Sequence, residues 1–245
     1  MPSLDAFSLS DMIQCQATLR QLGADATSVE EVARRTVDHL FDLFRSADTG
    51  ERSAVLVRFY KTHAFGDLPE DVKRFVVDRS GGHELNPETK CLTLLATRGT
   101  VDAWNSPDAS ERHRAIPLPG REVVEQSPMI AQLITQFGLA IEAVVAPDPN
   151  VIVELEQRAY NVFHVEDARG SPYVPDQDFV ESHGVRSVVG FGGMLPSSDF
   201  FTVIIFSRDS ISRGVAELFR TLSLSVKVAI LPLSSVRVFA QRAAT

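Results

Sequence analysis

The segment that most constrains the fold of this chain comprises residues 184–232. Its first part, residues 185–194, is mostly apolar and predicts a strand. After a turn-forming run of proline, serine and aspartate, residues 200–206 are rich in the β-branched and aromatic side chains typical of a buried strand. A long helix is predicted next, with Asp209 or Ser210 as its N-cap. The segment therefore predicts two neighbouring antiparallel strands followed by a helix.

The predicted closing helix carries more apolar surface than one sheet requires. A helix that covers a single sheet needs one apolar stripe. After Leu222 the apolar surface is wider than that, because of three residues: Leu224, Val228 and Leu231. Three basic residues recur every seven positions on the face expected to be solvated: Arg213, Arg220 and Lys227. We therefore expect a second partner for this helix, either the N-terminal helices of the same chain or the same helix of another copy.

The preceding residues combine helical and strand patterns. Residues 9–22 and the run after Ser28 have apolar residues at helical spacing, and Ser28 with Glu31 has the form of a capping box. A further helix is predicted to begin at Ser127 and Pro128. Strands are predicted at residues 53–60, 91–96, 115–118 and 159–165. Because strands and helices do not alternate regularly, this order predicts an α+β fold with a mostly antiparallel sheet.

Composition and charge exclude several classes of function. The net charge of −8 and the pI near 5.3 do not suit a general nucleic-acid binder, which needs a basic face. Two cysteines, Cys15 and Cys91, cannot form a disulfide framework and favour a reducing compartment. No apolar run approaches the roughly 20 residues that span a bilayer. We expect a cytoplasmic protein, complete or part of a larger signalling protein, that binds neither nucleic acid nor membrane.

Three segments, taken in order, resemble a known family. The first is SVEEVARRTVDHLFDLFRS followed by SAVLVRFY. The second is FHVEDARGSPYVPDQDFVESHGVRSVVGFGG, and the third is FTVIIFSRDSISRGVAELFRTLSLSVKVAI. They resemble the first helix and strand, the acidic loop between two strands, and the last strand and closing helix of GAF sensor domains. Residues 61–149 match that family more loosely.

The resemblance implies an architecture and a mode of assembly. GAF-like domains have a central antiparallel sheet of about six strands, with the helices that enter and leave the domain on one face and loops over a small-molecule pocket on the other. The family also implies homodimers formed through the N-terminal and C-terminal helices. We accordingly divide the chain into an N-terminal helical segment, residues 1–48, and a GAF-like sensor domain, residues 49–245, that includes the closing helix.

Five residues are candidates for ligand binding near the acidic loop and the strand that follows it: His164, Asp167, Tyr173, Arg186 and Phe191. Alternative structural roles remain open for them. His164 could be a hydrogen-bonded core residue. Arg186 could pair with Asp167 or Asp178, because a buried guanidinium needs a partner. Trp104 is a further candidate pocket aromatic, and Trp104, Tyr173 and Phe191 could equally pack in the core.

The glycine-rich run Gly190-Phe191-Gly192-Gly193 does not suit a phosphate-binding loop. Such a loop places its glycines directly before a helix, whose N-terminus supplies donors to the phosphate. Here a second strand follows instead. Glycines inside a strand more often permit a bulge or the close approach of another group. In a sensor domain that group could be a ligand.

No motif for catalysis or metal binding is present in the sequence. The six histidines do not form a Cys/His cluster, and no local Ser-His-Asp or Cys-His signature occurs. GAF-fold reductases of free methionine sulfoxide use cooperating cysteines, and bilin-binding members carry an attachment cysteine with a D-I-P-like segment. The surroundings of Cys15 and Cys91 match neither pattern. We predict no catalytic residue and no metal ligand, and the sequence names no cofactor.

The predicted function is a non-catalytic sensory or regulatory domain in signal transduction. It would bind a small molecule and signal through dimeric helices to a downstream partner. The alternatives are an enzyme or a chromophore-binding photoreceptor on the same fold, and a pure dimerisation module without a ligand. The sequence identifies neither the ligand nor the output partner.

Overall fold

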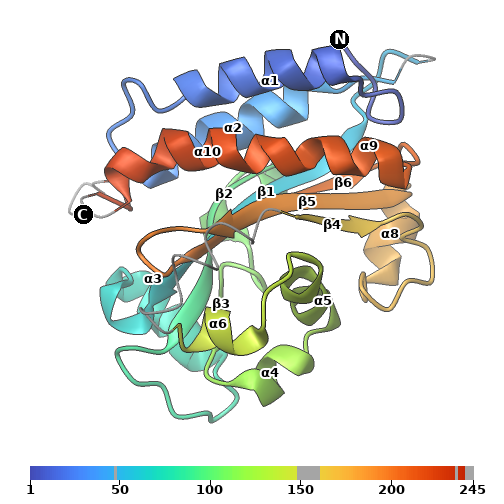
Figure 1. The fold of residues 1–245 in the computed structure, drawn as a ribbon. Helices are drawn as coiled ribbons and strands as arrows, with labels where there is room; N and C mark the ends of the chain where they lie inside the picture. Colours follow the sequence, from blue (N-terminus) through green and yellow to red (C-terminus); the bar gives the residue numbers. More distant parts are fainter. Residues whose placement is uncertain (47–48, 148–160, 235–236, 241–245) are drawn as a thin grey trace.

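A six-stranded antiparallel sheet forms the centre of the molecule (Figure 1). The computed structural model describes residues 1–46, 49–147, 161–234 and 237–240. The strand order is β3-β2-β1-β6-β5-β4. The bounds of the strands are β1 Ala54–Ala64, β2 Lys90–Gly99, β3 Ala115–Leu118, β4 Val162–Val165, β5 Ser187–Met194 and β6 Phe200–Ser207. The antiparallel sheet confirms the predicted α+β class, while residues 159–160 of one predicted strand lie outside the described residues.

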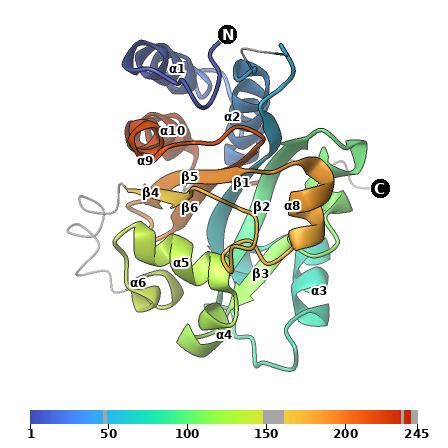
Figure 2. The same ribbon diagram turned by 90° about the vertical axis from the view of Figure 1, so that its right-hand side faces the viewer.

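Different helices cover the two faces of the sheet (Figures 1 and 2). One face carries what we call the helix layer: α1 Leu9–Gln21, α2 Val29–Leu43, α9 Arg213–Leu218 and α10 Leu222–Ile230. The other face carries loops and short helices: α4 Arg121–Glu125, α5 Pro128–Gln136, α6 Ile141–Val145 and α8 Gln177–His183. Helix α3, Glu70–Asp78, packs at the β2–β3 end of the sheet. The first and last helices thus share one face, as predicted. No helix in the described ranges has both the length and the apolar character to cross a membrane.

The first two helices begin at serine N-caps. Ser8 Oγ accepts a hydrogen bond from the Asp11 N–H, and the Asp11 carboxylate accepts one from the Ser8 N–H at 3.0 Å, which completes a capping box at α1. Ser28 Oγ accepts from the Glu31 N–H at 3.1 Å. The Glu31 carboxylate, however, accepts from the N–H of Thr27 at 2.8 Å rather than from Ser28. The capping box predicted at Ser28 is therefore only half formed.

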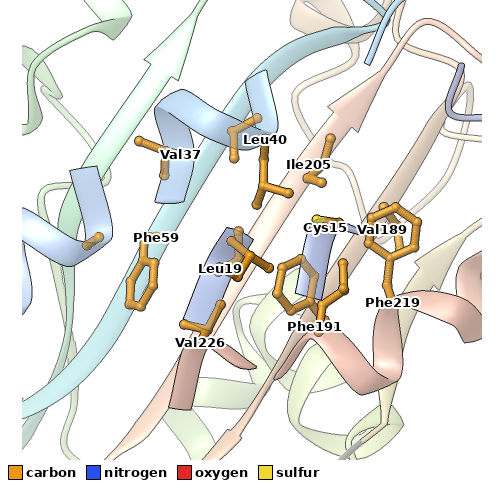
Figure 3. Packing of buried hydrophobic residues seen from close by; sticks show 14 of the residues in the cluster. Cys15, Leu19, Val37, Leu40, Phe59, Val189, Phe191, Ile205, Phe219 and Val226 are labelled. Atoms are coloured by element: carbon orange, nitrogen blue, oxygen red, sulfur yellow. The ribbon is translucent and has the colours of Figure 1, made fainter. Parts of the chain in front are cut away.

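A cluster of phenylalanines joins the helix layer to the sheet. Phe219 is fully buried, and its ring centroid lies 5.0 Å from that of Phe7 and 6.0 Å from those of Phe44 and Phe191. Figure 3 shows Phe191 of β5 and Phe219 among the buried residues between the helices and the sheet. Phe7 and Phe44 belong to the N-terminal segment, residues 1–48, so this segment shares its core with the rest of the chain. The domain boundary at residue 48 stays a prediction.

The closing helix begins later than predicted. Its N-cap is Ser212, whose Oγ accepts a hydrogen bond from the Val215 N–H at 3.4 Å, in place of the predicted Asp209 or Ser210. Asp209 instead uses its carboxylate to accept a hydrogen bond from the N–H of Leu4 at 3.2 Å. The cap is therefore displaced because the Asp209 side chain holds the N-terminal segment.

A 3-10 turn, Phe219–Thr221, divides the closing helix into α9 and α10. Its 3.0 residues per turn, against 3.6 in an α-helix, rotate the following residues relative to those before it. Lys227, predicted to be solvated with Arg213 and Arg220, is consequently buried, whereas the two arginines are exposed. Because of this change of helical pitch, basic residues seven positions apart in the sequence do not all lie on the same face of the helix.

Helices α1 and α10 run parallel and pack closely. The hydrogen bonds between α1 and the closing helix include one from Gln16 Nε2 to the carbonyl of Thr221 at 3.1 Å and one from Arg20 Nε to Ser225 Oγ at 3.3 Å. A Cβ atom added to Gly23 would lie 2.3 Å from the carbonyl oxygen of Ala229. Only glycine allows this approach, so α1 is the partner that covers one side of α10.

The glycines of β5 make room for atoms of the neighbouring strands and not for a ligand. A Cβ atom on Gly192 would lie 2.0 Å from the carbonyl oxygen of Phe201 on the neighbouring strand, and one on Gly190 would lie 3.3 Å from Cβ of Phe163. The expectation that these glycines make room for a ligand is thus wrong at these two positions. They allow β5 to pack tightly against its neighbours.

Candidate functional site

A cavity of about 980 Å³ lies on the face of the sheet opposite the helix layer. Strands β1, β2 and β6 form its floor. Strand β1 contributes Leu56, Arg58 and Tyr60, which are alternate residues and so point to the same side. The intervening Val57 and Phe59 belong to the core beneath the helix layer. A volume of this size is at the upper end of the range for small-molecule sites.

The register of the sheet places Arg58 at the middle of the floor. Its cross-strand neighbours are Thr97 on β2 and Ile204 on β6. Leu56 pairs with Phe206 in the adjoining row. All five side chains line the cavity. One cation therefore lies on a floor that is otherwise mainly apolar.

Aromatic rings form one wall of the cavity. A Cβ atom on Gly99 would lie 2.8 Å from the Trp104 ring, so the absence of a side chain lets the indole rest on the sheet. The Trp104 ring centroid is 5.5 Å from that of Phe179 and 4.6 Å from that of His183, both in edge-to-face geometry. Phe179 in turn meets Phe206 edge to face at 5.3 Å. This wall suits a flat or apolar group, since aromatic edges and faces pack well against both.

The remaining walls combine apolar side chains with a charged rim. Helix α5 contributes Met129, Ile130 and Leu133. The charged residues of the rim are exposed and include Glu111, Arg112, Asp176 and Asp178. Asp176 is partly occupied as the N-cap of α8, because its Oδ1 accepts from the Phe179 N–H at 3.0 Å. The charges at the mouth are therefore mixed, in contrast to the single cation on the floor.

Buried polar atoms on the floor lack partners. Among the described residues, neither Arg58 Nε nor Thr97 Oγ1 has a hydrogen-bond partner, although both atoms are buried. In the described part of the chain, the guanidinium donates one hydrogen bond, from Arg58 Nη1 to Tyr60 Oη at 3.4 Å. Burial raises the pKa of the Tyr60 phenol, so it remains protonated. Unsatisfied buried donors are rare in folded proteins, and at a cavity they mark a place for a ligand.

His113 also lines the cavity. The residue is exposed, yet neighbouring protein atoms shield part of its imidazole from water. Burial first, and then the positive charges of Arg58 and Arg112, lower the pKa of His113 to about 4. His113 is therefore neutral at pH 7 and offers one donor and one acceptor.

None of the five predicted ligand residues lines this cavity. His164 points away from it: His164 Nε2 lies 2.8 Å from the carbonyl oxygen of Ile211, to which it donates. Burial is the first cause of the lowered pKa of His164, so the ring is a neutral donor in this bond at pH 7. This hydrogen bond fits the structural alternative considered for His164, although the residue is half-buried and does not lie in the core. Its side chain ties β4 to the loop before α9.

The other four predicted residues are also separated from the cavity. Arg186 is exposed and forms no salt bridge with a described residue. Asp167 is exposed, and its Oδ1 accepts a hydrogen bond from the Arg169 N–H at 3.0 Å. Tyr173 packs, half-buried, at the margin of the core on the cavity side, and Phe191 is buried beneath the helix layer. The structure therefore does not bring the five together, and a ligand role for them stays untested.

The sequence contained a partial signal for the residues that line the cavity. The predicted strand 53–60 has Val57 and Phe59 on one face and Arg58 on the other, and a lone arginine among apolar strand residues is unusual. Trp104 was a candidate pocket aromatic and does line the cavity. Thr97 and Ile204 could not be found from sequence, because their place beside Arg58 depends on the pairing of strands that are distant in the chain.

The described residues offer little for metal or thiol chemistry. In this part of the chain, no group of three or more His, Cys, Asp or Glu side chains is arranged to hold a metal ion. Burial raises the pKa of both Cys15 and Cys91 to about 12. The two thiols therefore remain protonated at pH 7 and are poor nucleophiles.

Comparison with solved structures finds GAF domains. The protein is similar to the GAF domain of a phosphoenolpyruvate-protein phosphotransferase from Coxiella burnetii, with 12% identity, a TM-score of 0.45, and coverage of 92% of this chain and 95% of that one. The corresponding domain from Acinetobacter has 11% identity, a TM-score of 0.42, and coverage of 94% and 97%. A phycocyanobilin-bound GAF domain from a cyanobacterial phytochrome has 10% identity, a TM-score of 0.43, and coverage of 91% and 94%. No family model matches the chain, and no curated protein matches it. These similarities concern the fold and say nothing of the ligand.

Proposed function

We propose that the protein is a non-catalytic sensory or regulatory domain that binds a small molecule in the cavity and signals through its helix layer. The observation that carries this proposal is the difference between the two faces of the sheet: one face lines the cavity, and the other packs against the helices. Arg58 reaches the cavity from one side of β1, while Val57 and Phe59 of the same strand pack beneath the helices. A ligand that binds differently to two arrangements of the helices would shift the balance between them.

The cavity can be tested with an apolar fluorescent probe. Trp104 is the single tryptophan of the chain and lines the cavity. We expect 8-anilinonaphthalene-1-sulfonate to bind there, to quench the emission of Trp104 and to fluoresce by energy transfer from it. Thr97→Phe projects a ring from the floor into the cavity and should weaken this binding at least tenfold, by about 1.4 kcal/mol or more.

Thr100→Phe is the matched control, because Thr100 is exposed and follows β2 by one residue. It should leave the titration unchanged. Equal binding to wild type, Thr97→Phe and Thr100→Phe would place the probe elsewhere. That result, or the absence of energy transfer in wild type, would contradict a ligand site in this cavity.

We also propose that two copies of the chain associate through the outer side of the helix layer. On α10, Ser225 faces α1, and Val226 faces the core. Leu224 and Val228 fall on the remaining, outward side, and they are 48% and 50% exposed. Further exposed apolar residues of the helix layer and its end are Leu9 and Ile13 of α1 and Leu231, which directly follows α10. Clustered exposed apolar side chains favour an interface.

The assembly is tested by placing charge on that face. We expect wild type to have a dimeric mass by light scattering, and Ile13→Glu with Val228→Glu to raise the dimer dissociation constant at least 100-fold, because each glutamate would be buried without a partner. Val77→Glu is the control, since Val77 is similarly exposed, at 54%, but lies on α3. A monomeric wild type, or equal effects of the variants and the control, would overturn this proposal.

A further inference from the structure

We propose that the ligand of this cavity is an amphipathic carboxylate, whose acidic group pairs with Arg58 and whose apolar body lies against Trp104 and Phe179. This inference rests on the proposed function and specifies the chemical class of the ligand. It is carried by the juxtaposition of one unpaired guanidinium with an apolar floor and an aromatic wall.

Arg58 is a cation without a counter-ion. No carboxylate among the described residues lies within salt-bridge distance of it, although ten other basic side chains in that part of the chain are paired in this way. Its Nε is buried without a hydrogen-bond partner. A buried N–H of a guanidinium needs an acceptor, and the planar fork of an arginine matches a carboxylate with two parallel hydrogen bonds. The missing acceptor is therefore best supplied by a ligand.

The neighbouring groups complete a site for one carboxylate. Thr97 Oγ1 is buried without a partner beside Arg58, on the paired strand, and its hydroxyl provides a further donor. Tyr60 Oη lies 3.4 Å from Arg58 Nη1 on the other side. One arginine balances the single charge of a carboxylate. A phosphate monoester, with up to two charges, would leave excess negative charge on a floor that has one cation.

The rest of the cavity determines the body of the ligand. Ile204 and Leu56 lie beside Arg58 on the floor, and Trp104 and Phe179 stand at the wall. Burial of apolar area against these side chains supplies affinity, while the acidic group fixes orientation.

The charges at the mouth do not compete for Arg58. Asp176 and Asp178 lie at the exposed N-terminal end of α8, and Glu111 is exposed in the loop before β3. None of the three forms a salt bridge with Arg58 in the described part of the chain. Their negative charges repel a polyanion at the mouth. Solvent and salt screen these charges from a monoanion that is bound at the floor.

Calorimetric titration of the whole chain with three matched probes tests the proposal. 2-Naphthoate should bind about 10- to 100-fold more tightly than 2-naphthamide, which has the same ring and no charge, because hydrogen bonds to charged groups are the stronger kind. 2-Naphthyl phosphate should bind no more tightly than 2-naphthoate. Arg58→Met should remove the preference for the acid over the amide, and Arg112→Met, at the exposed rim, should keep it.

The folded state of the variant provides a second readout. Arg58→Met removes a buried donor that lacks a partner and keeps a long apolar side chain, so its midpoint of thermal unfolding without ligand should equal or exceed that of wild type. At equal concentrations of 2-naphthoate, the wild-type midpoint should rise more than that of Arg58→Met.

The outcomes separate this inference from the proposed function. Equal affinity of wild type for the acid and the amide, or a preference that persists in Arg58→Met, overturns the inference and leaves the cavity as a ligand site. Tighter binding of the phosphate overturns the choice of a carboxylate. Failure of 2-naphthoate to bind while the fluorescent probe binds in the cavity also overturns the inference alone, whereas failure of both contradicts the proposed function.

Discussion

Replacing Asp199 by asparagine should lower the free energy of unfolding by about 3–5 kcal/mol, because it leaves a buried lysine without its counter-charge. Asp199 lies in the turn between β5 and β6, and its carboxylate accepts from Lys61 Nζ at 2.6 Å and from Lys90 Nζ at 2.9 Å. The Lys61 side chain is only 1% exposed. Denaturant unfolding of wild type and Asp199→Asn measures the loss.

Two comparisons isolate this ion pair. Asp42→Asn breaks an exposed pair with Arg52 and should cost less than about 1 kcal/mol. Combining Asp199→Asn with Lys61→Met removes the buried charge together with its partner and should recover part of the loss. A cost below about 1 kcal/mol for Asp199→Asn alone would show that Lys61 finds another partner or water.

The pH dependence of this difference has a defined sign. Burial raises the pKa of Asp199, but the attraction of Lys61 and Lys90 and their hydrogen bonds outweigh it, so the net pKa lies below the usual value of 3.8. A carboxyl whose folded pKa is depressed stabilises the fold above its unfolded pKa and loses this effect as the pH falls through the folded pKa. The difference in free energy of unfolding between wild type and Asp199→Asn should thus have its full size at pH 7 and disappear at acid pH below 3.8.

Phe219→Ala should also cost about 3–5 kcal/mol, the range for removing a buried phenylalanine side chain. Phe219 is fully buried and touches Phe7, Phe44 and Phe191, which come from the N-terminal segment and from β5. The cavity left by its ring would therefore separate the closing helix from both. Thermal and denaturant unfolding measure the loss.

A surface substitution serves as the control for Phe219→Ala. Val77→Ala also truncates an apolar side chain, but Val77 is 54% exposed, so the change should stay within about 0.5 kcal/mol. If the N-terminal segment did not share the core, Phe219→Ala would cost little more than this control. The same result would contradict the packing in Figure 3.

The type and order of most secondary structure elements could be predicted from the sequence. The strand predicted over residues 200–206 and the helix after Ser28 are present, because local periodicity and capping act over a few residues. The short helices α4 and α6 were not predicted. Each has five residues, which is too short to show a helical repeat.

The predicted site residues and the cavity lie on different elements, for a physical reason. All eight residues of β5 are buried, so its sequence does not tell which face meets the helix layer and which meets the cavity. Phe191 was accordingly assigned to the pocket, although it packs against Phe219. The predicted ligand residues followed the acidic loop of the family resemblance, whereas the cavity lies over β1, β2 and β6.

By itself the sequence determined that the chain forms an antiparallel α+β fold closed by a helix too apolar for one partner. These are properties of local pattern, and burial of apolar stripes enforces them. Only the tertiary structure decided that Arg58 meets Thr97 and Ile204, because sheet register joins strands that are far apart in the chain. It also decided that α1 covers one side of α10 while Leu224 and Val228 stay exposed, since the 3-10 turn sets the rotation of that helix.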